Sequence, residues 1–128
     1  MSAAIGQVSN RDEARLNRAI GLSYNSECKQ RHASLIYKSN RLIATGINSS
    51  RVHNAYVKGY TEKPATFHAE ERAIRNAQAL VGEDLSGMVL YVARSYKNGK
   101  PAMSAPCIKC AKLIKKANIK KVIYTVGD

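Results

Sequence analysis

The stretch MVLYVARSYKNGKPAMSAPCIKCAKLIKKANIKKVIYTV, residues 88–126, decides the fold class. It opens with a continuous apolar run, Met88 to Ala93, which is typical of a strand covered on both faces. Pro106 introduces a helix that we expect to extend to about Ala117, and Lys121 to Val126 is predicted to form another strand. A strand, a helix and a strand in this order predict a right-handed crossover within a helix-covered sheet. The helix positions expected to face inward are Ile108, Ala111, Leu113, Ile114 and Ala117.

Two further units are predicted at the N-terminal end. Apolar residues at 3.6-residue spacing predict a helix over about Arg11 to Ser26, and Asn10 and Glu13 have the spacing of a capping box. Two short β-prone runs follow, Ala33 to Tyr37 and Arg41 to Ile47. Because turn-forming residues join them, they predict a β-hairpin.

The middle of the chain combines a long loop with a helix. Residues 49–66 show no clear periodicity, and loops of this length are often functional. Phe67 to Leu80 has one apolar face, and Gly82 lies just past its end, so we predict a helix there. The complete order is α β β α β α β, which predicts one domain over residues 1–128. Its fold is a three-layer α/β/α sandwich around a mixed sheet of about four strands.

The last strand ends close to Asp128, so the sheet is expected to finish there with an edge. Exposed edges are covered by a partner or protected by charge, and Lys120 and Lys121 supply charge. We expect a homo-oligomer.

The composition is that of an ordinary globular domain, with 45% hydrophobic and 23% charged residues. No run approaches the ~18 apolar residues of a membrane span, and Met1 to Asn10 has no signal-peptide pattern. A cytoplasmic protein with no membrane partner is therefore expected. Lys and Arg number 21 against 9 Asp and Glu, a formal net charge of +12. This charge favours an anionic partner, which a nucleotide, RNA or DNA would satisfy.

Three cysteines cannot pair completely, and Cys107 and Cys110 form a C-x-x-C. Metal or redox chemistry is therefore favoured over a disulfide framework. Cys28 is expected to be a buried apolar thiol of the first helix.

The strongest local signal is a pair of segments, TFHAE at residues 66–70 and APCIKC at residues 105–110. Each opens a predicted helix, so His68, Cys107 and Cys110 can converge near two helix N-termini. One imidazole and two thiolates suit zinc and leave a fourth position for water, as in catalytic sites. The helix N-termini should favour the thiolates, and Glu70 is placed to take and return a proton. A structural zinc site or a C-x-x-C redox pair remains the alternative.

These residues match the H-x-E and P-C-x-x-C signature of zinc deaminases, and the chain resembles the cytidine/deoxycytidylate deaminase superfamily over nearly all its length. The resemblance implies that His68, Cys107 and Cys110 bind Zn²⁺ and that Glu70 is the general acid and base. It also implies that Asn48, after T-G-I, contacts the sugar or base, and that the backbone of Ala69 contacts the base.

The function implied is hydrolytic conversion of a cytosine nucleoside or nucleotide, dCMP-like, to the uracil form with release of ammonia. One alternative is a polynucleotide deaminase acting on cytosine in single-stranded DNA or adenosine in tRNA. Another is a non-catalytic zinc-binding module, against which Glu70 argues.

Other polar residues have weaker roles in this interpretation. His32 and His53 are expected to be surface or hydrogen-bonded histidines. Lysines of the last predicted helix are expected to form its solvated face, with a nucleic-acid patch as the alternative: Lys109, Lys112, Lys115 and Lys116. Candidates for contact with a substrate phosphate are Arg51, Lys58, Lys63 and Arg94. Candidates for stacking on a base are Tyr56, Tyr60 and Tyr96.

Overall fold

The computed structural model describes residues 9–26, 28, 30–49 and 68–127. The elements are α1 (Asn10–Ser23), β1 (Arg31–Lys38), β2 (Arg41–Ile47), α3 (Ala69–Val81), β3 (Val89–Ser95), β4 (Pro101–Ala102), α4 (Ile108–Lys116) and β5 (Lys121–Tyr124). The predicted order of elements is confirmed, with β4 as an addition. The predicted loop beyond residue 49 lies outside the described residues. None of the described helices is long and apolar enough to cross a membrane.

The strands form one mixed sheet in the order β2-β1-β3, and two short strands share the free side of β3. β1 is antiparallel to both β2 and β3. β5 runs parallel to the first part of β3, whereas β4 is antiparallel to its last two residues. The described part of the chain therefore holds five strands where about four were predicted. A two-residue strand that begins with Pro101 leaves no periodicity for the sequence to reveal.

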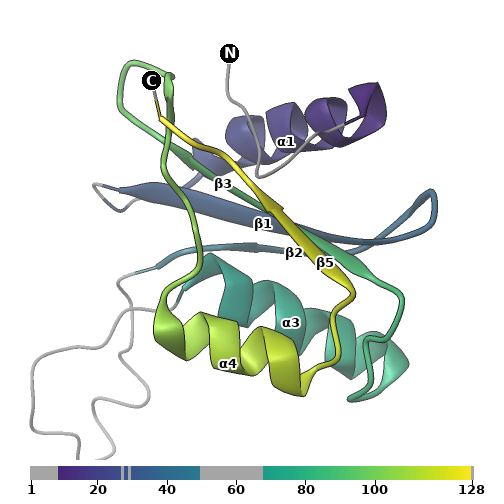
Figure 1. The fold of residues 1–128 in the computed structure, drawn as a ribbon. Helices are drawn as coiled ribbons and strands as arrows, with labels where there is room; N and C mark the ends of the chain where they lie inside the picture. Colours follow the sequence, from purple (N-terminus) through teal and green to yellow (C-terminus); the bar gives the residue numbers. More distant parts are fainter. Residues whose placement is uncertain (1–8, 27, 29, 50–67, 128) are drawn as a thin grey trace, which may run out of the picture.

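Helices cover both faces of the sheet: α1 lies on one face, and α3 and α4 lie on the other (Figure 1). Alternate residues of β1 divide between the two layers, as strand geometry requires. Leu35 and Tyr37 pack with Leu16 of α1, whereas Ile36 packs with Ile74 of α3. The predicted three-layer α/β/α architecture is confirmed. The double cover also explains why β3 is apolar on both faces.

The first helix is capped one residue earlier than predicted. Ser9 is the N-cap: its hydroxyl accepts from the backbone N–H of Asp12 at 3.0 Å, and the Asp12 carboxylate accepts from the backbone N–H of Ser9 at 3.4 Å. The expected pair, Asn10 and Glu13, was wrong because Asn10 is already the first helical residue. The helix also ends at Ser23, three residues before the predicted end, where the Ser23 hydroxyl bonds the Ile20 carbonyl and Ser95.

Close packing between β2 and α3 depends on Gly46. A Cβ at this position would lie 2.5 Å from the carbonyl oxygen of Ala69 and 2.5 Å from the backbone nitrogen of Ala73. Those distances are far inside van der Waals contact. The absent side chain therefore lets the first turn of α3 lie directly on the sheet.

The buried face of α4 differs from the predicted one. Cys110, Ile114 and Ala117 are buried, at i, i+4 and i+7. Ile108 is 77% exposed and Ala111 is exposed, so their predicted inward positions were wrong. The helix begins at Ile108, and a residue two positions before Cys110 points to nearly the opposite side of a helix.

Candidate metal centre

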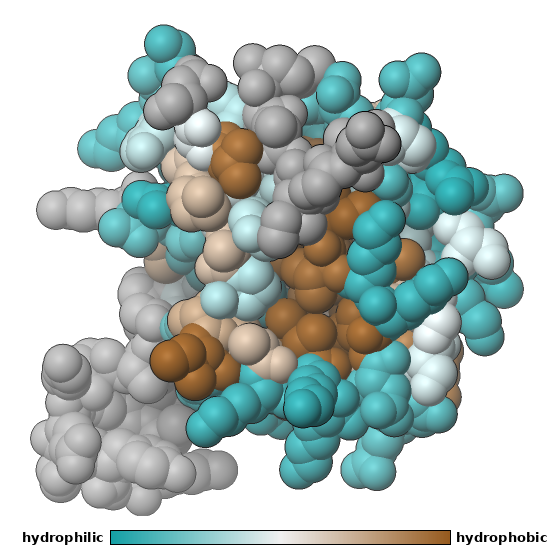
Figure 2. All heavy atoms as spheres, in the orientation of Figure 1, coloured by the Kyte–Doolittle hydropathy of each residue, from teal (hydrophilic) through white to brown (hydrophobic). Residues whose placement is uncertain are grey.

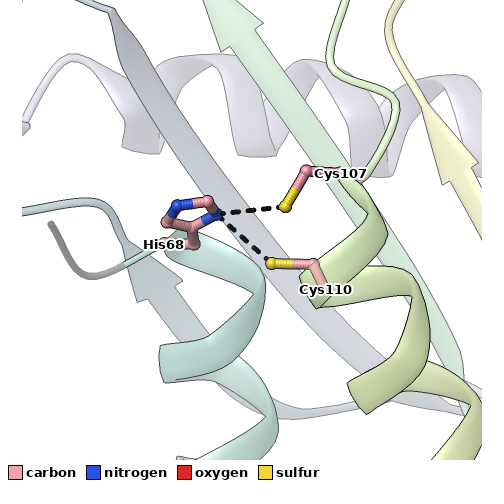
Figure 3. A group of neighbouring side chains, drawn as sticks. All are labelled: His68, Cys107 and Cys110. Carbon is pink, nitrogen blue, oxygen red and sulfur yellow. Dashed lines mark hydrogen bonds between the residues drawn. The ribbon is translucent and has the colours of Figure 1, made fainter.

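Two helix N-termini place three ligand-type side chains together (Figure 3). His68 is the N-cap of α3, Cys107 is the N-cap of α4, and Cys110 lies in the first turn of α4. In the described part of the chain, neither N-cap side chain makes a capping hydrogen bond. Both are therefore available to each other. Nδ1 of His68 lies 3.3 Å from Sγ of Cys110 and 3.7 Å from Sγ of Cys107.

The donor set fits a tetrahedral zinc ion. The ligand atoms of His68, Cys107 and Cys110 all lie within 4.8 Å of one another. Sulfur and nitrogen ligands at about 2.3 and 2.0 Å from a tetrahedral ion are roughly 3.5 to 4 Å apart, so small side-chain movements suffice. Among the described residues, this cluster contains three such ligands and no fourth. Three protein ligands are the number that a catalytic zinc site provides.

The environment of the cysteines also favours a cation. Burial raises the pKa of the Cys110 thiol, and the charges of Glu70 and Cys107 raise it further. The sequence had suggested that the helix N-termini would favour thiolates, but burial beside a carboxylate has the larger effect on Cys110. A divalent cation would reverse this balance, because it stabilises both sulfur anions.

Glu70 lies in the first turn of α3, two residues after His68, and its side chain is only 5% exposed. Burial raises the pKa of its carboxyl group, while its own backbone N–H and the charge of His68 act in the opposite direction. A buried carboxyl group at the edge of a cavity can hold a proton and pass it to a bound molecule.

A cavity of about 310 Å³ adjoins the cluster. Its lining residues are Cys28, Gln30, His32, Asn48, His68, Ala69, Glu70, Ala105 and Cys107. Five of the six residues singled out from the sequence as site residues thus line the cavity, and the sixth, Cys110, belongs to the adjoining cluster. Four lining residues were missed: Cys28, Gln30, His32 and Ala105.

Asn48 holds the wall of the cavity through its side-chain amide. Its Oδ1 accepts from the Ser26 hydroxyl at 2.6 Å and from the backbone N–H of His32 at 2.9 Å. Its Nδ2 donates to the carbonyl oxygen of Gln30 at 2.7 Å. These opposite partners fix the orientation of the amide. Asn48 therefore ties the segment after α1 to the start of β1.

Cys28 and His32 occupy positions that the sequence did not suggest. Cys28 follows α1 and lines the cavity, so its expected place inside the first helix was wrong. His32 is half-buried in β1 and faces the same cavity. Burial lowers the pKa of His32, the Gln30 carbonyl opposes this, and Arg94 and His68 lower it further. No local motif could have revealed these positions: strand register brings His32 to the site, and Cys28 lies in the segment between α1 and β1.

Several weaker candidates lie outside the described residues: Arg51, His53, Tyr56, Lys58, Tyr60 and Lys63. Of the remaining two, Arg94 is the cross-strand partner of His32, and its guanidinium lies 5.7 Å from the centre of the Tyr96 ring.

Comparisons with known proteins agree with this geometry. The family model described as the cytidine and deoxycytidylate deaminase zinc-binding region matches residues 9–126. The structure of dCMP deaminase from the cyanophage S-TIM5 has 25% sequence identity and a TM-score of 0.67, with 92% of this chain and 84% of that chain covered. No curated protein matches the chain by sequence.

Two further structures share the fold. Guanine deaminase from Bacillus subtilis has 24% identity and a TM-score of 0.63, over 94% of this chain and 66% of that chain. Cytidine deaminase from Mycobacterium leprae has 20% identity and a TM-score of 0.57, over 92% and 94%. The predicted family, enzyme class and zinc cofactor are confirmed, because the family model covers nearly the whole chain. The chain belongs to the cytidine and deoxycytidylate deaminase family of zinc-dependent hydrolytic deaminases.

Proposed function

We propose that this protein converts a cytosine nucleoside or nucleotide, dCMP-like, to its uracil form with release of ammonia. The observation that carries the proposal is the buried carboxyl group of Glu70, which lines the same cavity as His68 and Cys107. A structural zinc site has no use for a buried acid beside its ligands, so this arrangement favours catalysis over a non-catalytic binding module.

His68, Cys107 and Cys110 would hold the zinc ion. When bound, zinc supplies a water molecule that is ionised near neutral pH. Glu70 then moves protons: its carboxylate accepts one proton and gives it to the ring nitrogen beside the amino-bearing carbon. It then takes the second proton of the attacking water and delivers it to the departing amino group, so that it ends ionised, as it began. Water and the cytosine compound thereby yield the uracil compound and ammonia.

Asn48 and Ala69 would orient the substrate. The first N–H of the Asn48 amide is used on Gln30, which leaves its second N–H for a sugar or base oxygen. Ala69 lines the cavity, where its backbone would contact the base. The likeness to a dCMP deaminase supports a cytosine nucleotide as the substrate.

A polynucleotide substrate is the second candidate, and one observation favours it. The four lysines of α4, Lys109, Lys112, Lys115 and Lys116, are all exposed, and α4 carries no acidic residue. The helix begins beside the cavity, with Cys107 as its N-cap, so a single strand could run from the lysines to the site.

Ammonia release by the zinc-loaded protein tests the proposal across cytidine, dCMP, dCTP, adenosine, guanine and a single-stranded oligonucleotide. We expect Glu70→Gln to keep its zinc and its melting temperature while kcat falls by roughly 10² to 10⁴. The matched control is Glu71→Gln, because Glu71 is also buried but pairs with Arg75 at 3.3 Å instead of lining the cavity. Release of ammonia from none of these compounds would overturn the proposed function.

A further inference from the structure

The start of β1 and the end of β3 place two basic side chains beside the cavity. His32 and Arg94 are directly opposite in the antiparallel register, so their Cβ atoms are about 5 Å apart. Both have the strand parity of Ile36 and Val92, which pack under α3 and α4. They therefore lie on the face of the sheet that bears the metal cluster, and His32 lines the cavity itself.

One hydrogen-bond donor of Arg94 lacks an acceptor. Its Nε is buried and has no hydrogen-bond partner among the described residues. Buried donors are nearly always paired, so such an atom requires an explanation. Within the described part of the chain, the ion pair found joins Arg75 and Glu71, and no carboxylate neutralises Arg94.

The guanidinium group has one aromatic neighbour. It lies over the ring of Tyr96, 5.7 Å from the ring centre, and Tyr96 is itself set by a turn in which its N–H donates to the Lys100 carbonyl. A guanidinium group with an unpaired donor can bind a phosphate group through two parallel hydrogen bonds.

We propose that His32 and Arg94 form the subsite for the 5′-phosphate of the substrate, so that the protein selects a nucleotide over the corresponding nucleoside. The inference rests on the proposed function, which puts the base at Glu70. A cavity of about 310 Å³ is at the small end of ligand pockets. The base and sugar fill it, and the phosphate lies at its edge, where Arg94 supplies charge and His32 a hydrogen bond.

Binding measured without turnover tests the subsite. In the zinc-loaded Glu70→Gln background, calorimetry would give dissociation constants for dCMP and for deoxycytidine. We expect dCMP to bind at least about tenfold more tightly, the effect of one or two hydrogen bonds to a charged group. Adding Arg94→Met should bring the ratio of the two constants close to one, Arg94→Lys should restore part of it, and His32→Leu should lower it.

Arg31→Met is the matched control. It removes the same charge from the neighbouring position of β1, whose side chain has the opposite strand parity, and the ratio should persist. Melting temperatures of all variants check the fold. The subsite is overturned if dCMP fails to bind, if Arg94→Met and Arg94→Lys both leave the ratio unchanged, or if Arg31→Met lowers it equally. It is also overturned if an oligodeoxycytidylate without a terminal phosphate depends on Arg94 more than dCMP does.

The two proposals fail separately. If the protein releases ammonia but the ratio of the two dissociation constants does not depend on Arg94, the subsite is wrong and the deaminase function stands. If the ratio depends on Arg94 but no substrate releases ammonia, the deaminase function is wrong and the site binds nucleotides without converting them.

Discussion

The cap positions of the two central helices are occupied by side chains that do not cap. Serine, threonine, aspartate and asparagine at an N-cap typically stabilise a protein by about 1 kcal/mol relative to a residue that cannot cap. His68 and Cys107 occupy N-caps with extended backbone and make no such bond within the described chain. Local stability is thus sacrificed where the side chains are directed at one another, as is expected of a functional site.

This trade predicts opposite effects of one substitution on the apo and zinc-loaded forms. Cys107→Ser places a good N-cap residue on α4 and removes a metal ligand. We expect the chelator-treated protein to gain roughly 1 kcal/mol in free energy of unfolding. We expect zinc affinity, and the rise in melting temperature that zinc produces in the wild type, to be largely lost.

Cys28→Ser is the control for the Cys107 substitution, because Cys28 lines the cavity but lies outside the metal cluster. It should keep stoichiometric zinc by metal analysis. Full zinc retention in Cys107→Ser, or equal loss in both variants, would contradict the assignment of Cys107 as a ligand.

The residues found from the sequence are those whose chemistry is concentrated in short segments. Residue type and spacing within a few positions were enough to identify two pairs: His68 with Glu70, and Cys107 with Cys110. His32 gives no such signal, since a histidine in a β-prone run has no partner in its own segment. Its importance emerges only when strand register sets it opposite Arg94.

At the scale of elements, Gly46 sets the distance between β2 and α3. Gly46→Ala would force its Cβ against two backbone atoms of the helix, each 2.5 Å away, and backbone cannot rotate aside as a side chain can. We expect a loss of about 1 to 3 kcal/mol in free energy of unfolding, with weaker zinc binding because His68 moves with α3. Chemical denaturation and metal titration measure the two effects.

Gly21→Ala is the control for Gly46→Ala. Gly21 is exposed within α1, and a Cβ there would contact nothing within 4 Å. The substitution should stabilise the protein by up to about 1 kcal/mol, because alanine favours a helix over glycine. A Gly46→Ala protein as stable as the wild type would show that the helix can shift at no cost.

The cap of α1 makes stability dependent on pH. Burial alone would raise the pKa of Asp12, but hydrogen bonds from the Tyr91 hydroxyl and from Ser9 outweigh it and lower the pKa below its usual 3.8. A carboxyl group with a lowered folded-state pKa stabilises the protein above its unfolded pKa. That stabilisation is lost as the pH falls through the folded-state value.

We therefore expect Asp12→Asn to be less stable than the wild type between pH 5 and 7, by roughly 1 kcal/mol for the weakened hydrogen bonds. The difference should shrink as the pH falls below about 4. Urea denaturation at several pH values measures it. A difference that stays constant down to pH 2 would exclude a contribution from the ionised carboxylate.

The elements themselves were predictable to different degrees. Helices and long strands show a periodic pattern of apolar residues in the sequence, so their order was predicted correctly. The exact cap was not, because Ser9 and Asn10 are both good N-cap residues and the choice depends on Tyr91, which is remote in sequence and donates to Asp12. β4 was missed because its pairing with β3 is set by a turn and by Ser104 and Thr125, not by a local pattern.

At the scale of the whole molecule, the outer edge of β5 is where we expect association with another chain, if it occurs. Within the described residues β5 pairs with β3 on one side only, and Figure 2 shows hydrophobic surface in this region, surrounded by hydrophilic side chains. Unpaired edges and apolar patches favour contact with another chain, whereas Lys120 and Lys121 oppose it. A homo-oligomer stays a prediction, which sedimentation equilibrium would measure.

The net charge of +12 predicts that the protein binds anions in two ways, which differ in how strongly their affinity depends on salt concentration. Oligonucleotides should bind the exposed lysines of α4 through many phosphates, so their affinity should fall by orders of magnitude between 50 and 200 mM salt. Mononucleotide binding at the proposed subsite would involve one phosphate beside half-buried side chains, so the KM for dCMP should change by less than roughly threefold.

Replacing both Lys112 and Lys116 with glutamine distinguishes the surface charge from the site. These exposed residues lie two and six positions beyond Cys110 and do not line the cavity, so the double variant should bind oligonucleotides more weakly and keep the KM for dCMP. In that case the basic surface attracts anions without defining the substrate. If the wild type instead deaminates an oligonucleotide at 200 mM salt with a higher kcat/KM than dCMP, and the double variant loses this advantage, the lysines of α4 belong to the substrate-binding surface and the substrate is a polynucleotide.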